Sequence, residues 1–349
     1  MLKRKKALPA LLSLPLLLAG CVTHSSELAP TNEIDRILPG HTQREKAGPP
    51  LPAGAYYEPT DAEAADADSR GNPAGSWRPD DKDAKERVPE IVKRGRVIVG
   101  VDQSHNLLSY RDTTTGQMSG FEVDLAHEIA RDIFDDPSKV DFRFLSSAER
   151  VDALESGKID MVVRTMTINE ERQKQVEFST PYLDASTRLL ALKSSGIDSL
   201  ESTGGKRVCA TAGSTSLNQA RLHLPDAQLL ITRSWGDCLM ALQLSQADAV
   251  ITDDTLLSGM VDQDSYTEIV GEPMSTESYG VGIKKSRPGD DTRPLVRQVN
   301  STLERLRRDG TWARLYNEWF GPYLAPASPP ALDYRSEDPA DDSEEARND

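Results

Sequence analysis

Three arginines, Arg150, Arg164 and Arg172, lie among small hydroxyl residues between Ser146 and Pro181, and such a set can bind a small acid. Arginine stays charged at neutral pH, and its planar guanidinium can hold a carboxylate through two parallel hydrogen bonds. The alternative is a solvent-exposed charged surface, since most arginines in proteins are mostly exposed. Residue type alone does not distinguish a binding site from an exposed surface. The predicted elements around the arginines provide further evidence.

The pattern around the arginines favours a binding site. Residues 159–163 alternate like a strand that ends at residues 164–167, Arg-Thr-Met-Thr, and residues 170–176 then indicate a turn or a short helix. In open α/β folds, ligands bind at such strand ends.

A second candidate site for an anion lies at residues 212–216, Ala-Gly-Ser-Thr-Ser, which lead into a helix through Arg221. A Gly-Ser-Thr turn at the start of a helix presents free backbone amides and hydroxyls, and these suit an anion. Simple capping of the helix is the alternative, and the local sequence by itself favours it. Another strand, at residues 247–252, ends at two acids, Asp253 and Asp254.

The elements between Glu86 and Tyr323 alternate as in an α/β protein. The pattern predicts strands at residues 96–101, 140–144, 206–210, 247–252 and 279–284. Helices are predicted at residues 121–134, 235–244, 295–309 and 312–320, and a further helix begins within 147–154. We interpret the aromatic stripe of the last helix as core rather than as a ligand site.

The amino-terminal end resembles a lipoprotein secretion signal. Basic residues at 3–6 precede an apolar run at 7–18 that is too short to span a bilayer comfortably, so residues 1–20 are predicted to be cleaved. Cys21, in Leu-Ala-Gly-Cys, resembles the lipobox cysteine that carries the lipid in bacterial lipoproteins. An ordinary secreted protein with an incidental cysteine is the alternative. Composition predicts a disordered tether at residues 21–85 and a disordered acidic tail at residues 326–349.

Charge and cysteine content narrow the class of protein. The formal net charge is −15, and removing the four basic signal residues leaves −19, which disfavours nucleic acid and anionic lipid as partners. Cys209 and Cys238 remain as an even pair in an oxidising compartment, so we expect a disulfide. The pair lacks neighbouring His or Cys ligands for a metal, and it is not a CxxC redox motif. We expect neither a metal nor a cofactor.

Several segments resemble the family 3 solute-binding proteins, which deliver polar amino acids to ABC importers. The resemblance covers about residues 86–325, and its order and spacing match throughout. Its marks are GFEVDLAHEIARDI at 120–133, GKIDMVVRTMTINEERQKQVEFSTPY at 157–182, VCATAGSTS at 208–216, ADAVITDD at 247–254, and the closing segments YGVGIKK and DGTWARLYNEWF. The cysteine pair, the lipobox, and the stretches NLLSYRD and VVRTMTI look most like the glutamate/glutamine-binding lipoproteins of actinobacteria.

The resemblance implies a two-lobed α/β fold of the periplasmic-binding-protein type II class, with two crossing hinge strands and lobes that close on the ligand. Lobe 1 would comprise residues 86–183 and 281–325, and lobe 2 residues 186–277. The expected disulfide would lie wholly within lobe 2.

The resemblance also implies a role for each site residue. Arg172 matches the family arginine that pairs with the α-carboxylate of the ligand. The strand-end residues Thr165 and Thr167 match contacts to the α-amino and α-carboxylate groups, and Ser214 and Thr215 match contacts to the α-carboxylate from lobe 2. Asp253 matches the acid that binds the α-ammonium, with Asp254 as the less favoured candidate.

Selectivity for the ligand side chain is where the chain departs from the general family pattern. Many members carry aromatic rings at the position of Ser147 and near His105, and both residues are polar here. Ser147 and Arg150 instead resemble the Ser-x-x-Arg element of glutamate/aspartate binders, which takes the side-chain carboxylate. Arg164 is a spare cation that either lines the cleft or points out of it, and His105 either lines the cleft or caps a loop.

These features predict a lipid-anchored, monomeric receptor on the extracytoplasmic face of the cell membrane. Its ligand would be L-glutamate or L-aspartate, with glutamine or asparagine as candidates if Arg150 does not meet the ligand. Its protein partner would be an ABC importer permease or, in the alternative output, a membrane sensor protein that controls signalling. An enzyme is the least favoured class, because the sequence contains no Ser-His-Asp set or metal cluster.

Overall fold

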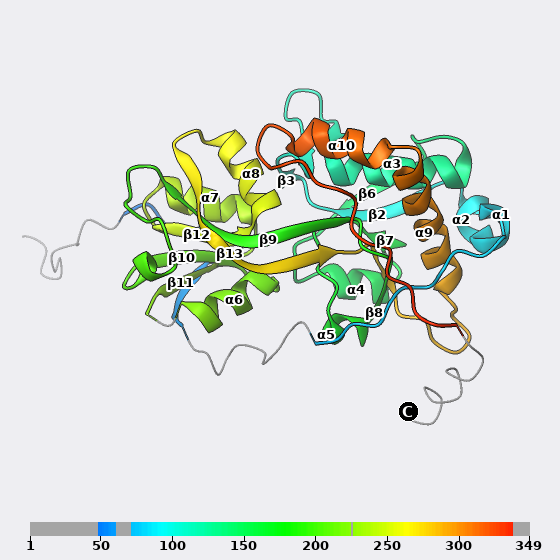
Figure 1. Cartoon of the computed structure of the whole chain (residues 1–349), viewed down its shortest axis with the longest axis horizontal. Coiled ribbons are helices and arrows are strands. Elements are labelled where there is room, and N and C mark those ends of the chain that lie inside the picture. Colours follow the sequence, from blue (N-terminus) through cyan, green and yellow to red (C-terminus); the bar gives the residue numbers. More distant parts are fainter. Residues whose placement is uncertain (1–47, 61–70, 225, 338–349) are drawn as a thin grey trace, which may run out of the picture. The chain divides into compact units, whose positions relative to one another are not determined.

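Figure 1 shows the computed structural model of the chain, which describes residues 48–60, 71–224 and 226–337. The predicted signal peptide, Cys21 with its predicted lipid, most of the predicted tether and the end of the predicted tail lie outside these residues and stay predictions. Within the described ranges, no helix combines the length and the apolar character needed to cross a bilayer.

Lobe 1 is built on a five-stranded sheet in the order β6-β2-β7-β14-β8. Its strands are β2 (Val97–Val101), β6 (Val140–Phe144), β7 (Met161–Val162), β8 (Val176–Phe178) and β14 (Gly282–Lys284). Strand β2 pairs in parallel with β6 and β7, and β14 is antiparallel to β7 and β8. The carboxyl ends of β2 and β7 therefore meet at one edge of the sheet, where Asp102 and Arg164 follow the two strands.

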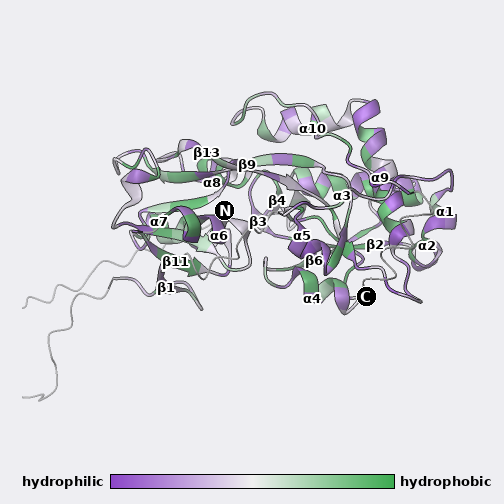
Figure 2. Cartoon of the chain, turned by 60° about the horizontal axis from the view of Figure 1, so that its bottom comes forward, coloured by the Kyte–Doolittle hydropathy of each residue, from purple (hydrophilic) through white to green (hydrophobic). Residues whose placement is uncertain are grey.

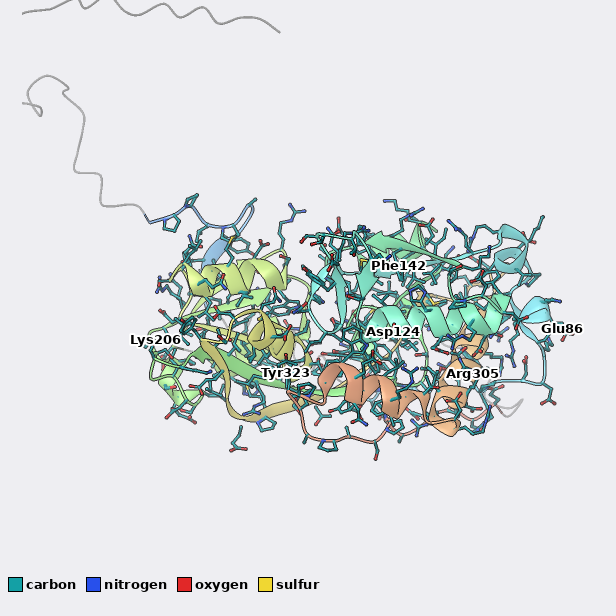
Figure 3. All side chains as sticks on the ribbon, turned by 90° about the horizontal axis from the view of Figure 1, so that it is seen from above. Glu86, Asp124, Phe142, Lys206, Arg305 and Tyr323 are labelled. Atoms are coloured by element: carbon teal, nitrogen blue, oxygen red, sulfur yellow. A yellow bond between two sulfur atoms is a disulfide. The ribbon has the colours of Figure 1, made fainter. Side chains whose placement is uncertain are left out.

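The helices of lobe 1 are α1 (Ala84–Arg87), α2 (Pro89–Arg94), α3 (Phe121–Phe134), α4 (Arg150–Glu155), α5 (Glu170–Gln173), α9 (Arg293–Arg308) and α10 (Thr311–Phe320). Helix α3 forms at the predicted residues, and Phe121 at its start packs against Trp312 and Phe320 of α10. Figure 3 labels Asp124, which accepts a hydrogen bond from α10, and Arg305, which joins α9 to α3 through ion pairs. Helix α9 carries both apolar and polar residues along its length, as the green and purple of Figure 2 show. The packing of Trp312 and Phe320 against Phe121 makes the aromatic residues of α10 part of the core, as predicted.

Lobe 2 is built on a six-stranded sheet in the order β1-β11-β10-β12-β9-β13. Its strands are β1 (Tyr56–Pro59), β9 (Leu183–Leu192), β10 (Arg207–Thr211), β11 (Gln228–Thr232), β12 (Ala249–Asp253) and β13 (Thr267–Tyr279), and its helices are α6 (Thr215–His223), α7 (Trp235–Gln243) and α8 (Asp254–Gln263). The predicted disulfide is confirmed: Cys209 of β10 is bonded to Cys238 of α7, and their Cα atoms lie 5.6 Å apart. The disulfide links β10, a central strand of the sheet, to α7, the helix that follows β11.

The two crossing strands are β9 and β13, the long neighbouring arrows of Figure 1. They are antiparallel, and their pairing runs from Thr267 and Leu192 to Tyr279 and Leu183, with a register shift between Val270 and Ser275. The strand predicted at 279–284 is therefore two strands: β13 ends at Tyr279, and β14 begins at Gly282 and joins the sheet of lobe 1. Gly280 lies at the break, where an added Cβ would meet the Ile168 side chain at 2.8 Å.

A third, small sheet carries one of the predicted site residues. Strands β3 (Ser104–His105), β4 (Ser109–Arg111) and β5 (Met118–Ser119) form an antiparallel sheet in the order β3-β4-β5. It follows β2 and precedes α3, so it places His105 near the carboxyl end of β2.

The described parts of the predicted tether and tail are folded, which corrects the expectation of disorder there. Residues 56–59 form β1, which pairs antiparallel with β11, and the Tyr57 hydroxyl donates to the Gln246 carbonyl at 2.6 Å. Ser76 forms a β-bridge with Tyr334 of the tail. Trp77 is buried, and the guanidinium carbon of Arg335 lies 4.2 Å from the centroid of its ring. The prediction of disorder rested on the overall Pro- and acid-rich composition, which does not register a few aromatic residues. These residues bury enough apolar surface to order short segments.

Candidate ligand-binding site

Seven of the ten predicted site residues meet at one cavity between the two lobes, and Thr167, Arg164 and His105 do not line it. From lobe 1 it is lined by four of them, Ser147, Arg150, Thr165 and Arg172, and from lobe 2 by three, Ser214, Thr215 and Asp253. Ser216, Trp235, Thr252 and Leu256 complete the lining. The enclosed volume is about 10 Å³, which holds about one water molecule, so an amino acid can enter only if the lobes separate or the lining side chains move.

Arg150 begins helix α4 and is buried, with 3% of its surface exposed. Its Nε donates to the Ser147 carbonyl at 2.9 Å, and its Nη1 donates to the carbonyls of Arg164 and Thr165 at 3.1 and 3.2 Å. Its Nη2 reaches across the cleft to the Gly213 carbonyl of lobe 2 at 3.2 Å. Burial and the neighbouring arginine charges lower the pKa of Arg150, yet it stays a cation because guanidinium is so strong a base. Carbonyls, rather than a carboxylate, therefore surround a buried positive charge.

Arg172 lies on the short helix α5, whose start is capped by the Asn169 side chain. Its Nη1 donates to the Thr167 carbonyl at 2.9 Å, and its Nη2 donates to the Gly213 carbonyl at 3.4 Å. Burial lowers the pKa of Arg172, and the facing acids Glu277 and Asp253 partly offset that shift. Both cleft arginines thus share one carbonyl of lobe 2 as a partner.

Arg164 does not line the cavity, which settles the direction of the spare cation. It is fully buried, and it donates from Nη2 to Asp102 Oδ2 at 2.6 Å and from Nη1 to Ser147 Oγ at 2.7 Å. Burial would raise the pKa of Asp102, but His105, Arg164 and the hydrogen bonds from Ser104 hold it well below its usual range. Asp102 therefore compensates the charge of Arg164 inside lobe 1.

Thr165 has a backbone conformation that a β-branched residue rarely adopts, with φ +38°. Its amide donates to Glu122 Oε1 at 2.6 Å, and the Tyr182 hydroxyl donates to the same oxygen at 2.6 Å. Burial raises the pKa of Glu122, while these hydrogen bonds act against the rise. The buried carboxyl of Glu122 and the guanidinium of Arg150 hold Thr165 from both sides, which is how strain at functional positions persists.

In lobe 2, Ser214 caps helix α6, so the capping alternative is correct for its side chain. Its hydroxyl donates to the Thr211 carbonyl at 2.6 Å and accepts from the Leu217 amide at 3.1 Å. Thr215 lies 3.5 Å from Thr167 across the cleft, measured between their Oγ1 atoms. Gly213 has φ +73°, and an added Cβ would lie 3.1 Å from the Cα of Ala148 in lobe 1. This glycine therefore permits the close approach of the lobes.

Asp253 ends β12 and is the acid that faces the cavity. Its Oδ1 accepts from Thr187 Oγ1 at 2.9 Å, and its Oδ2 accepts from the Tyr279 hydroxyl at 2.5 Å. Asp254 does not line the cavity, because its Oδ1 accepts from the Ser186 amide at 3.1 Å at the start of α8. Burial and the facing carboxyl of Glu277 raise the pKa of Asp253 to about 7.

His105 lies in a second cavity that shares Trp235 and Leu256 with the first. It is buried, and neither ring nitrogen has a hydrogen-bond partner among the described residues, although Nε2 lies 3.4 Å from Asp102 Oδ2. Burial lowers the pKa of His105 to about 4, so the ring is neutral at pH 7. His105 therefore lines an adjoining cavity rather than the cavity of the predicted site residues, and its ring does not cap a loop.

Two further hydrogen bonds join the lobes outside this cavity. Asp262 of α8 accepts hydrogen bonds from Asn106 Nδ2 and from the hydroxyl of Tyr323, which is labelled in Figure 3.

Sequence reasoning missed several residues in and around this site, among them Ser216, Thr252 and Leu256 of the lining. Asp102 directly follows a buried strand, so the strand-end rule that selected Asp253 could have found it. Glu122 and Trp235 lie in helices, where a polar or aromatic residue carries no local signal of a site. Glu277 lies in a long strand that the sequence did not predict.

The chain matches the family model described as bacterial extracellular solute-binding proteins, family 3, over residues 97–322. It is 34% identical over 236 residues to the ABC transporter glutamine-binding protein of Bacillus subtilis, covering 67% of this chain and 85% of that protein. It is 32% identical over 242 residues to the glutamate-binding protein of Corynebacterium glutamicum, covering 66% and 80%.

Among solved structures, it is similar to a mutant of the arginine-binding protein of T. maritima, with a TM-score of 0.60 and 28% identity over 67% of this chain and 99% of that one. This similarity confirms the two-lobed α/β fold. The family match spans both lobes and every lining residue of the cleft, so the chain belongs to the family 3 bacterial extracellular solute-binding proteins.

Proposed function

We propose that this protein is a receptor for an acidic amino acid, L-glutamate or L-aspartate, which it delivers to an ABC importer when the lobes close. The proposal includes a lipid anchor on Cys21 at the extracytoplasmic face of the membrane. The family supports binding of a small solute outside the cytoplasm, and the relatives named for glutamine and glutamate support an amino acid.

The observation that carries the proposal is the pair of guanidinium groups at the cleft. Among the described residues, neither Arg150 nor Arg172 forms an ion pair with a carboxylate, whereas Arg164 does. Two cations and one acid, Asp253, match the two carboxylates and one ammonium of an acidic amino acid. Arg172 would take the α-carboxylate and Asp253 the α-ammonium, with Thr165, Thr167, Ser214 and Thr215 as the further contacts.

Arg150 would take the carboxylate of the ligand side chain, beside Ser147. Of its five N–H groups, one donates to Gly213 of the opposite lobe, so opening of the cleft frees part of Nη2 for a ligand. The neutral ring of His105 in the adjoining cavity would donate or accept one hydrogen bond at the end of that side chain.

Calorimetry of the soluble chain from Val22 onward against glutamate, aspartate, glutamine and asparagine tests the proposal. This chain keeps the folded segments at 49–60 and 71–85. We expect micromolar or tighter binding of the two acids. Loss of a desolvated charge pair costs about 2–5 kcal/mol, so the amides should bind at least about thirtyfold more weakly. Equal or tighter binding of glutamine would refute the role given to Arg150.

Matched variants separate the role of Arg150 from a general loss of positive charge. Arg150→Lys keeps the charge but loses the planar fork, so we expect a weaker preference for glutamate over glutamine. Arg143→Lys is the control, because Arg143 lies on β6 away from the cleft and pairs with Asp141. Glutarate, which lacks the ammonium, should bind much more weakly than glutamate if Asp253 has its assigned role.

A further inference from the structure

Glu277 is a buried acid that stands behind the cleft and that the proposed function does not use. It lies on β13, two residues before Tyr279, and only 1% of its surface is exposed. Its Oε2 atom has no hydrogen-bond partner among the described residues. A fully ionised carboxylate with one oxygen unpaired in the interior is costly, so this group needs a physical explanation.

A continuous row of hydroxyl groups joins Glu277 to Asp253. Glu277 Oε1 lies 2.9 Å from Ser275 Oγ, which lies 3.0 Å from Thr187 Oγ1, which lies 2.9 Å from Asp253 Oδ1. The register of the sheet sets this row, because Thr187 of β9 is the partner of both Asp253 on β12 and Ser275 on β13. The row therefore runs from the interior to the acid that faces the cleft.

Counting hydrogens along the row indicates that one is missing if both acids are ionised. The row has three oxygen–oxygen contacts, but the two hydroxyls supply only two hydrogens. If both acids were ionised, Thr187 would donate to Asp253 and Ser275 to Glu277. The 3.0 Å contact between Thr187 and Ser275 would then bring two oxygens together with no hydrogen between them. One additional proton on the acids completes all three hydrogen bonds.

Either acid can hold this proton, and the hydrogen bonds that Asp253 accepts favour its lying on Glu277 when the cleft has no ligand. Asp253 accepts from Thr187 and from the Tyr279 hydroxyl, and such charge-assisted bonds favour a carboxylate there. A protonated Glu277 would donate from Oε1 to Ser275 and leave Oε2 as a neutral carbonyl oxygen.

The charged and titratable groups that face this pair come from three elements. Tyr279 on β13 donates to Asp253, and Asp254 at the start of α8 adds a negative charge that favours protonation. Arg172 on α5 opposes protonation through its positive charge. The raised pKa of Asp253 agrees with a pair that holds a proton near neutrality.

We propose that ligand binding is coupled to release of this shared proton, and that Glu277 is the positioning residue responsible for the coupling. A concerted shift of three hydrogens along the row converts neutral Glu277 and ionised Asp253 into ionised Glu277 and neutral Asp253. The arriving ammonium then displaces the proton from Asp253 to water, so that both acids end ionised beside one ammonium. The inference rests on the proposed function only in placing the α-ammonium at Asp253.

Calorimetry in buffers with different ionisation enthalpies measures the protons released per ligand bound, between about pH 6 and about pH 8. For the wild-type protein we expect release that approaches one proton at the acidic end, with affinity rising by up to about tenfold per pH unit there. Glutamate and glutamine should behave alike, because both carry the α-ammonium. Absence of proton release with either ligand would overturn the inference.

Glu277→Gln is the decisive variant, because its amide can donate to Ser275 as the protonated acid does but has no proton to release. We expect its affinity to be nearly independent of pH over this range, and release equal to that of the wild type would overturn the inference. Glu177→Gln is the matched control: Glu177 is a buried acid on β8 that pairs with Lys285 outside the cleft, so wild-type release should persist.

A measurement on the wild-type protein keeps the test valid if the Glu277 variant does not fold. The infrared band of protonated carboxylic acids should lose intensity when glutamine is added near pH 6, and an unchanged intensity would refute the coupling. Glu122, whose pKa burial also raises, would contribute equally with and without ligand. Failure here with intact glutamate binding refutes the coupling alone. Tighter binding of glutamine with normal proton release refutes the acidic ligand and leaves the coupling in place.

Discussion

Replacing Arg164 tests whether this arginine stabilises the fold or binds the ligand. Arg164→Gln removes a fully buried guanidinium that contacts Asp102 at 2.6 Å and Ser147 at 2.7 Å. The Asp102 side chain, only 8% exposed, is then left without its cation. We therefore expect the variant to lose stability rather than ligand selectivity.

The geometry sets the size of this loss. Breaking a buried ion pair by removing one partner costs about 3–5 kcal/mol, because it leaves an uncompensated charge inside the protein. Asp102 keeps hydrogen bonds from Ser104 and from the Gln103 amide, which offset part of the cost. We expect about 3 kcal/mol, a large part of the roughly 5–15 kcal/mol that stabilises a typical domain.

Urea denaturation of a double-mutant cycle measures this value. The second variant, Asp102→Asn, removes the buried charge, so Arg164→Gln in that background should cost about 1–3 kcal/mol less than in the wild type. Arg143→Gln is the control for an exposed ion pair and should cost less than about 1 kcal/mol. Wild-type stability of Arg164→Gln together with a selective loss of glutamate affinity would refute the structural role.

Four further outcomes are expected. Arg172→Ala should abolish binding of glutamate, aspartate, glutamine and asparagine in calorimetry, because all four share the α-carboxylate, and retained affinity would show that the site is misassigned. Gly213→Ala should weaken binding by about tenfold or more, since its Cβ and its φ of +73° both oppose closure, and small-angle scattering with ligand should show fewer closed molecules. Replacing Cys209 and Cys238 by alanine should lower the free energy of unfolding by about 3.5 kcal/mol, given their separation of 29 residues. The folded-state pKa of Asp102 lies below its unfolded value, so its contribution to stability is present above about pH 4 and is lost as pH falls, and acid titrations of Asp102→Asn should lack this component.

Local patterns were reliable where the determining contacts are close in the sequence. The apolar spacing of residues 121–134 predicted α3 with its bounds, because one helical face is buried whatever partner covers it. The Gly-Ser-Thr turn predicted a helix start, with an anion site and simple capping as alternatives, and Ser214 both caps α6 and lines the cavity. The compositional prediction of disorder failed at 56–59 and at Trp77, where a few anchoring side chains outweigh a polar background.

The sequence by itself determined the family pattern, the disulfide pair and the residues that converge on the cleft. Only the tertiary structure decided that Arg150 and Arg172 line the cleft, whereas Arg164 pairs with Asp102 inside lobe 1. Asp102, which neutralises Arg164, is 62 residues away in the chain and reaches it because parallel strands β2 and β7 end at one edge. The row of hydroxyls between Glu277 and Asp253 likewise depends on the register of three strands, and such contacts across a sheet leave no local trace in the sequence.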